Sequence, residues 1–105
     1  MSVIHATDAD FESALGSQPK TIVKYYADWC GSCRLISPKF KRLSEDERFT
    51  GIQFLEVNAE ENAQARKMAG VSNLPFFAVF QGKDLVASAA TNKEEAIVEM
   101  LQQLK

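Results

Sequence analysis

Cysteine, histidine and long apolar runs are all scarce in this 105-residue sequence. Its longest apolar runs are far too short to cross a bilayer, so no membrane-spanning helix is expected. The net charge is only −2, without a basic stripe or a block of like charge, and we expect neither nucleic acid nor an anionic membrane as a partner. Internal repeats, linkers and low-complexity tracts are absent too. Together with the length, this predicts one domain over residues 1–105.

Residues 1–8 lack both the basic and the apolar segments of a secretory signal, so we expect a cytoplasmic location. In that reducing compartment, two nearby cysteines are redox-active or bind a metal rather than acting as a structural staple. The chain has only two cysteines, Cys30 and Cys33, and they are separated by two residues. We therefore expect the chemistry of this protein to centre on them.

The apolar pattern predicts strands that alternate with helices and end in a β-hairpin. Strands are expected at residues 3–5, 21–27, 52–57, 76–80 and 84–89. Helices are expected at 11–16, from the cysteine pair to about 48 with a kink at Pro38, at 62–69, and from about 94. The expected caps are Thr7 or Asp8 for the first helix, Gly70 at the end of the third, and a Thr91–Glu94 capping box for the fourth. This order predicts an α/β fold with a mixed sheet and helices on both of its faces.

The cysteine pair lies where the strand at 21–27 gives way to the long helix. The first turn of a helix has backbone N–H groups without intrahelical partners, and the helix macrodipole is positive there. Both effects favour a thiolate, which is the nucleophile of disulfide exchange. A spacing of three residues along one turn brings the two Cα atoms to within roughly 5–6 Å, a distance that a disulfide spans. We expect Cys30 to be the exposed attacking sulfur and Cys33 the resolving one.

Along nearly its whole length the sequence resembles the thioredoxin family. The resemblance rests on the motif Trp29-Cys30-Gly31-Ser32-Cys33-Arg34 at a strand–helix junction, and on Gly70-Val71-Ser72-Asn73-Leu74-Pro75 before an apolar strand. It implies a thioredoxin fold, with a mixed five-stranded sheet flanked by four helices, and dithiol–disulfide exchange. It also implies that Pro75 is cis and faces the cysteines. The implied substrate groove is formed by Trp29, Gly31, Ser32, Asn73, Leu74 and Pro75, with backbone groups of Asn73 and Leu74 available to an extended substrate segment.

Two departures from the family pattern bear on the chemistry. Ser32 stands where the family usually has proline, and it adds an N–H and a hydroxyl near the sulfurs. Because extra donors stabilise the thiolate, we expect a pair somewhat more oxidising than in a typical thioredoxin, and a lower potential for Ser32→Pro. A lesser departure is Ala89-Ala90-Thr91, where the family usually has a glycine in a longer loop that lines the groove.

The second departure is Lys24, in the middle of an apolar strand where the family usually carries a buried aspartate. Glu56, in the next strand, stands where the family usually has a lysine. Because a buried ammonium needs a carboxylate, we expect an ion pair with its charges exchanged. Glu56, acting through Lys24 or a water, is a candidate for proton transfer to Cys33. The alternative is a purely structural pair that satisfies two buried charges.

The function predicted from these residues is thiol–disulfide oxidoreduction of protein substrates through Cys30 and Cys33. The resemblance implies a thioredoxin reductase as electron donor, no metal or organic cofactor, and a monomer. A zinc site is the first alternative, but the chain could add only His5 to the cysteines unless two copies shared a Cys₄ site. The second is a redox-switched binding module, which would bind a partner protein without catalytic turnover.

Overall fold

A computed structural model describes residues 3–104, and all the predicted strands and helices are present in it. The strands are β1 (Ile4–His5), β2 (Lys20–Tyr26), β3 (Gln53–Asn58), β4 (Phe76–Gln81) and β5 (Asp84–Ala90). The helices are α1 (Phe11–Gly16), α2 (Gly31–Ser44), α3 (Ala63–Ala69) and α4 (Glu94–Gln102), with a short 3₁₀ turn, η1 (Glu47–Phe49), after α2. Most predicted boundaries are correct to within one residue.

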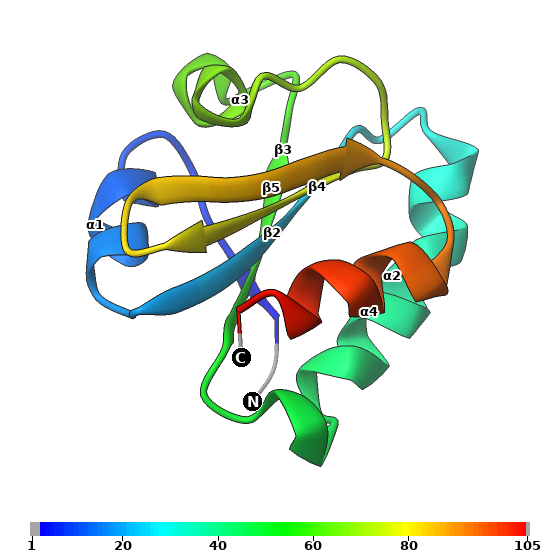
Figure 1. Ribbon diagram of the computed structural model, residues 1–105. Coiled ribbons are helices and arrows are strands. Elements are labelled where there is room, and N and C mark those ends of the chain that lie inside the picture. The colour runs from blue at the N-terminus through cyan, green and yellow to red at the C-terminus, as the bar shows by residue number, and fades with distance from the viewer. Residues whose placement is uncertain (1–2, 105) are drawn as a thin grey trace.

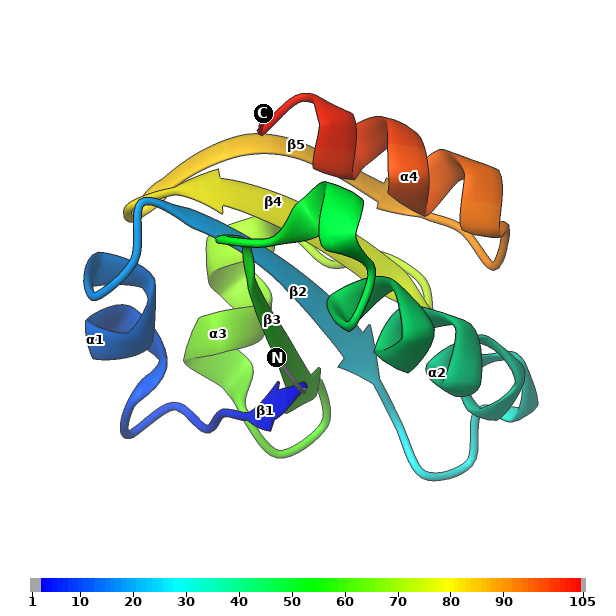
Figure 2. The same ribbon diagram turned by 90° about the horizontal axis from the view of Figure 1, so that it is seen from below.

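The five strands form one sheet in the order β1-β3-β2-β4-β5. The central strand β2 is parallel to β3 and antiparallel to β4, so the sheet is mixed as predicted. Helices α1 and α3 lie on one face of the sheet, and α2 and α4 lie on the other (Figures 1 and 2). Because β2 is covered on both faces, its side chains are nearly all buried, which explains its continuous β-branched and aromatic sequence.

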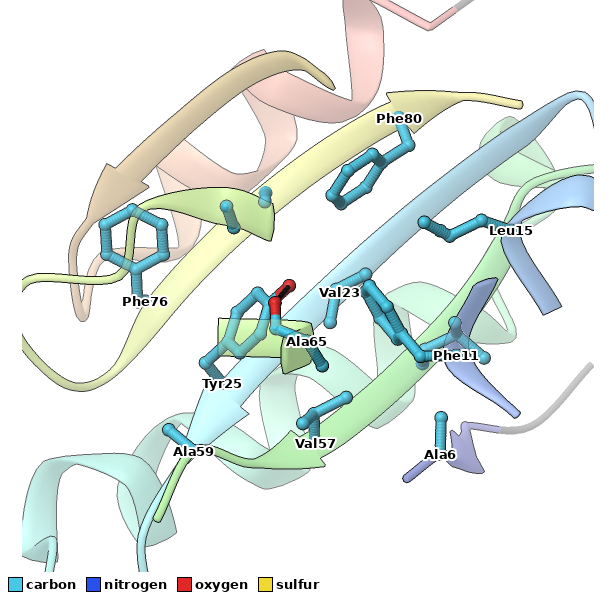
Figure 3. Packing of buried hydrophobic residues seen from close by; sticks show 13 residues of the cluster. Ala6, Phe11, Leu15, Val23, Tyr25, Val57, Ala59, Ala65, Phe76 and Phe80 are labelled. Carbon is cyan, nitrogen blue, oxygen red and sulfur yellow. Dashed lines mark hydrogen bonds between the residues drawn. The ribbon is translucent and has the colours of Figure 1, made fainter. Parts of the chain in front are cut away.

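Aromatic side chains pack the sheet against the helices on each face. On the α1–α3 face, the rings of Phe11 and Tyr25 pack with those of Phe80 and Phe76 among small and aliphatic residues (Figure 3). The Tyr25 hydroxyl donates to the backbone oxygen of Ala65 at 2.9 Å. On the opposite face, the Phe40 ring of α2 lies 5.2 Å from that of Phe54 and 5.5 Å from that of Phe77. These contacts hold α2, and therefore the first turn that carries Cys33, against the sheet.

The predicted end of α2 is wrong. The helix was expected to reach about residue 48, but it ends at Ser44, and Asp46 has an extended backbone (φ −79°, ψ 130°). The Asp46 carboxylate accepts a hydrogen bond from the Arg48 N–H at 2.9 Å, which starts the separate turn η1. Pro38 lies inside α2 without ending it.

Two of the predicted helix caps are also wrong. Asp10 occupies the N-cap position of α1, and the Asp8 carboxylate instead accepts the N–H groups of Gln64 and Ala65 in the first turn of α3. The Thr91 hydroxyl accepts from the Lys93 N–H, in a local turn before α4, in place of a capping box with Glu94. The prediction for α3 is confirmed, since Gly70 ends it in the left-handed region (φ 66°, ψ 40°).

Candidate active site

Cys30 and Cys33 are joined by a disulfide at the junction between β2 and α2, with Cα atoms 5.3 Å apart, as the spacing predicts. Cys30 is the N-cap of α2, and Cys33 lies in the first turn. The Cys33 N–H donates to the Cys30 sulfur at 3.1 Å. In the dithiol form, the same N–H at the helix start can donate to a Cys30 thiolate and so favours negative charge on that sulfur.

The expectation that Cys30 is exposed is wrong for this disulfide form, in which only 5% of the residue is accessible. Its sulfur is bonded to Cys33 and faces the helix start. The two cysteines pack with Ala27 against Tyr26 and Leu74. Burial of both residues follows from their position between the end of β2 and the segment before β4.

A groove of about 300 Å³ lies beside the cysteine pair. The Leu74–Pro75 peptide bond is cis, as the resemblance implies. The Pro75 carbonyl accepts from the Thr91 N–H, whereas Asn73 and Leu74 make no backbone–backbone hydrogen bond within the described residues. Their backbone groups are therefore available to an incoming extended segment. The residues that line the groove are Ser32, Asn73, Leu74, Pro75, Ala90, Thr91 and Asn92.

Trp29 and Gly31 do not line this groove. Trp29 is exposed (65%), and its indole N–H donates to Glu60 Oε2 at 2.6 Å. Glu60 was not recognised from the sequence. Ser32 lines the groove, but within residues 3–104 no hydrogen bond from it reaches either sulfur, so its effect on the potential stays a prediction.

The predicted ion pair is present. Lys24 and Glu56 are register partners in the parallel pair β2–β3, and Lys24 Nζ lies 3.5 Å from Glu56 Oε1. Lys24 is buried, with 4% of the residue exposed. Burial lowers the pKa of its ammonium, and the neighbouring Glu56 carboxylate opposes that shift. Proton transfer through this pair stays a prediction.

Sequence reasoning missed two partners of this pair. Ser37, one turn beyond Cys33, accepts from Lys24 Nζ at 2.7 Å, and its own hydroxyl donates to the Cys33 carbonyl at 2.8 Å. His5, for which no role was predicted, has its Nδ1 3.6 Å from Glu56 Oε2. The spacing of four residues could have suggested the bond from Ser37 to the Cys33 carbonyl, but the contact with Lys24 depends on the rotation of α2 against the sheet. The contact of His5 requires the pairing of β1 with β3, which the sequence does not reveal.

Lys24, Cys33, Ser37 and Glu56 all line one cavity of about 220 Å³, here called the lysine cavity. Tyr26, Ala27, Asp28 and Arg34 complete its lining. The lysine cavity and the groove have no lining residue in common, and Cys33 lines the first but not the second. Arg34 donates to the backbone oxygen of Asp28 at 2.7 Å, which holds the loop before the cysteines.

Within the described residues, no group of three or more histidine, cysteine and carboxylate side chains is arranged to hold a metal ion. A search of the same residues finds no helix long and apolar enough to cross a membrane. The bonded pair Cys30–Cys33 itself supports reversible dithiol–disulfide exchange.

Comparison with known proteins agrees with this geometry. The family model described as Thioredoxin matches residues 2–103. A thioredoxin of Malassezia sympodialis is 28% identical over 101 residues, which cover 93% of this chain and 95% of that protein. A thioredoxin of Allochromatium vinosum is 30% identical over 88 residues, covering 83% and 81%.

Two further matches concern a larger protein and the fold. The chain is 37% identical over 81 residues to a peptide-N(4)-(N-acetyl-beta-glucosaminyl)asparagine amidase of Caenorhabditis briggsae, covering 77% of this chain but only 13% of that protein. The structure of thioredoxin f from spinach chloroplast superposes with a TM-score of 0.89 at 21% identity, over 98% of this chain and 93% of that one. The latter likeness shows the same fold.

Proposed function

This chain belongs to the thioredoxin family, and from that membership we propose that it reduces disulfides of other proteins in the cytoplasm. A close CxxC pair in a thioredoxin fold makes it a thiol–disulfide oxidoreductase. The reducing direction, the location and the monomeric state are our proposal. The observation that carries it is the bonded pair at the start of α2, where the Cys33 N–H contacts the Cys30 sulfur.

The proposed reaction has two exchanges. The Cys30 thiolate attacks one sulfur of a substrate disulfide, and the other substrate sulfur leaves as a thiolate. Cys33 then loses its proton and attacks Cys30, which releases the second substrate sulfur and forms the Cys30–Cys33 disulfide. Two electrons have passed to the substrate. A reductase of the thioredoxin reductase class would return two electrons to the pair.

The groove supports a protein substrate in an extended conformation. The backbone groups of Asn73 and Leu74 have no backbone partner within residues 3–104, so they can pair with a substrate segment as a strand does. Ser32 and Pro75 also line the groove, which brings such a segment to the cysteine loop. The shortened loop at Ala90 and Thr91 forms the far wall, where selection among substrates would act.

The test is the equilibrium potential of the Cys30–Cys33 pair in a glutathione redox buffer, together with turnover on a protein disulfide. A potential below the cytosolic glutathione poise and multiple turnovers with a reductase are expected for a reductant. A potential above that poise would contradict the reducing direction. Stoichiometric binding without turnover would identify a redox-switched binding module instead.

A further inference from the structure

The buried Lys24 ammonium is held in one orientation by partners from different elements. Its shortest contact is the neutral Ser37 hydroxyl of α2 at 2.7 Å, and the Glu56 carboxylate of β3 is more distant, at 3.5 Å. The faces of Tyr26 and Phe40 lie 5.5 and 5.6 Å from the same nitrogen. The ammonium is therefore bonded to α2 through a hydroxyl, while a half-buried carboxylate of β3 balances its charge.

Ser37 connects this cation to the resolving cysteine. Its hydroxyl proton is committed to the Cys33 carbonyl at 2.8 Å, so a lone pair of the same oxygen is left to accept from Lys24. A serine that bonds back to the preceding turn gives a helix no stability of its own. The contact instead fixes the position of the lysine relative to the turn that carries Cys33.

We propose that Ser37 is a positioning residue for the second exchange, holding the Lys24 ammonium at the lysine cavity where its positive charge stabilises the Cys33 thiolate. The inference rests on the resolving step of the proposed function. In that step Cys33 releases its proton to solvent or a base in the lysine cavity. Its thiolate then forms the bond to Cys30 as the Cys30–substrate bond breaks. A buried cation in the cavity that Cys33 also lines favours the Cys33 thiolate and so lowers its pKa, whereas a buried carboxylate in the same place would raise that pKa.

Other charged groups also line the lysine cavity and contribute to the electrostatic potential at Cys33 in any titration. Glu56 comes from β3 and contacts His5 of β1, Tyr26 comes from β2, and Asp28 and Arg34 come from the loop and from α2. Substituting Ser37 changes none of these charges. A titration shift in that variant therefore reports where Lys24 lies.

The experiment is a ¹³Cβ NMR titration of both cysteines in the reduced chain, with Ser37→Ala, Ser37→Thr and the control Ser44→Ala. Ser44 is a buried serine of α2 whose hydroxyl also bonds a backbone carbonyl, that of Lys41, and within residues 3–104 it has no lysine ammonium as a partner. We expect Ser37→Ala to raise the Cys33 pKa and to cut its thiolate fraction about threefold to tenfold at neutral pH. Ser37→Thr should restore the parent pKa of Cys33, and Ser44→Ala should leave that pKa unchanged.

Stopped-flow release of 5-thio-2-nitrobenzoate from a mixed disulfide on Cys30 gives a second readout. The rate of 5-thio-2-nitrobenzoate release from Ser37→Ala should fall at neutral pH by the same factor as the Cys33 thiolate fraction. The rate should recover at alkaline pH, because Cys33 is then fully ionised and its thiolate attacks Cys30 as well as in the parent. Lys24→Gln, which keeps donors but removes the charge, should raise the Cys33 pKa at least as much.

A lower melting temperature for Ser37→Ala with unchanged Cys33 titration and release would show a structural hydroxyl and overturn the proposal. Failure of threonine to restore the titration would do the same. The titration uses neither substrate nor reductase, so a potential above the glutathione poise would overturn the reducing direction without touching this result.

Discussion

At the scale of single residues, each cysteine has its own source of positive potential. Cys30 receives the Cys33 N–H at the start of α2, and Cys33 shares the lysine cavity with Lys24. The first source is a property of any helix start, whereas the second depends on a buried cation that must be kept charged. Glu56 serves that purpose, since burial and the carboxylate shift the Lys24 pKa in opposite directions.

Glu56 offers a test of proton transfer in the second exchange. Its Oε1 faces Lys24, its Oε2 faces His5, and it lines the lysine cavity with Cys33. We expect Glu56→Gln to slow resolution of the mixed disulfide at neutral pH, because the amide cannot accept a proton. Stopped-flow release from Cys30 measures this, with Glu12→Gln, an exposed carboxylate of α1 outside the lysine cavity, as the control. An unchanged rate would leave Glu56 with a structural role.

The lowered pKa of Lys24 also makes stability depend on pH. Burial favours the neutral amine in the folded state, so the unfolded chain binds more protons between the lowered pKa and 10.5. The cost of burying the ammonium is fully present below that window and is relieved as the pH rises through it. We expect Lys24→Met to raise the free energy of unfolding relative to the parent most at neutral pH. The difference between the two unfolding free energies should narrow toward pH 10.5. Urea denaturation at several pH values measures it, and a difference that widens with pH would have the wrong sign.

At the scale of elements, Asp8 joins the segment before α1 to the start of α3. Its carboxylate accepts from the N–H groups of Gln64 and Ala65 at 3.2 and 2.8 Å, and its own N–H donates to Asn62 Oδ1 at 2.7 Å. We expect Asp8→Ala to cost about 1 kcal/mol of unfolding free energy, the usual loss for an N-cap, in urea denaturation. Asp8→Asn keeps an acceptor and should lose less. A loss no greater than that of Glu12→Ala, an exposed substitution on α1, would contradict the cap.

Asp8 also illustrates where sequence reasoning stops. A capping residue followed by an apolar stripe predicts a helix correctly, but a carboxylate can cap any helix start that the fold brings to it. Gly70 could be predicted because a left-handed C-cap depends only on its own backbone. The Lys24–Glu56 pair could be predicted from the strand pattern and the resemblance together. Ser37 and His5 could not, because their contacts depend on the rotation of α2 and on the pairing of β1 with β3.

At the scale of the whole molecule, the sheet separates two layers of helices. Helices α2 and α4 cover the face of the sheet that carries Phe77 (Figure 2), and the cysteine pair lies at the start of α2. The lysine cavity is formed between α2 and the sheet, while the groove is formed by α2, the segment before β4 and the end of β5. A substitution in the first turn of α2 can therefore alter both the lysine cavity and the groove.

This arrangement couples folding stability to the redox state. A disulfide across a separation of three residues removes chain entropy worth at most about 2 kcal/mol from the unfolded state. Thiolate stabilisation by the start of α2 and by Lys24 favours the reduced form and offsets part of that gain. We expect the oxidised chain to be the more stable in urea, by less than about 2 kcal/mol, which places the folded pair's potential up to about 40 mV below that of the unfolded chain. Denaturation of both forms, with Cys30→Ser/Cys33→Ser as a redox-insensitive control, measures the difference. A more stable reduced form would mean that folding makes the pair an oxidant, against the reducing role proposed for this chain.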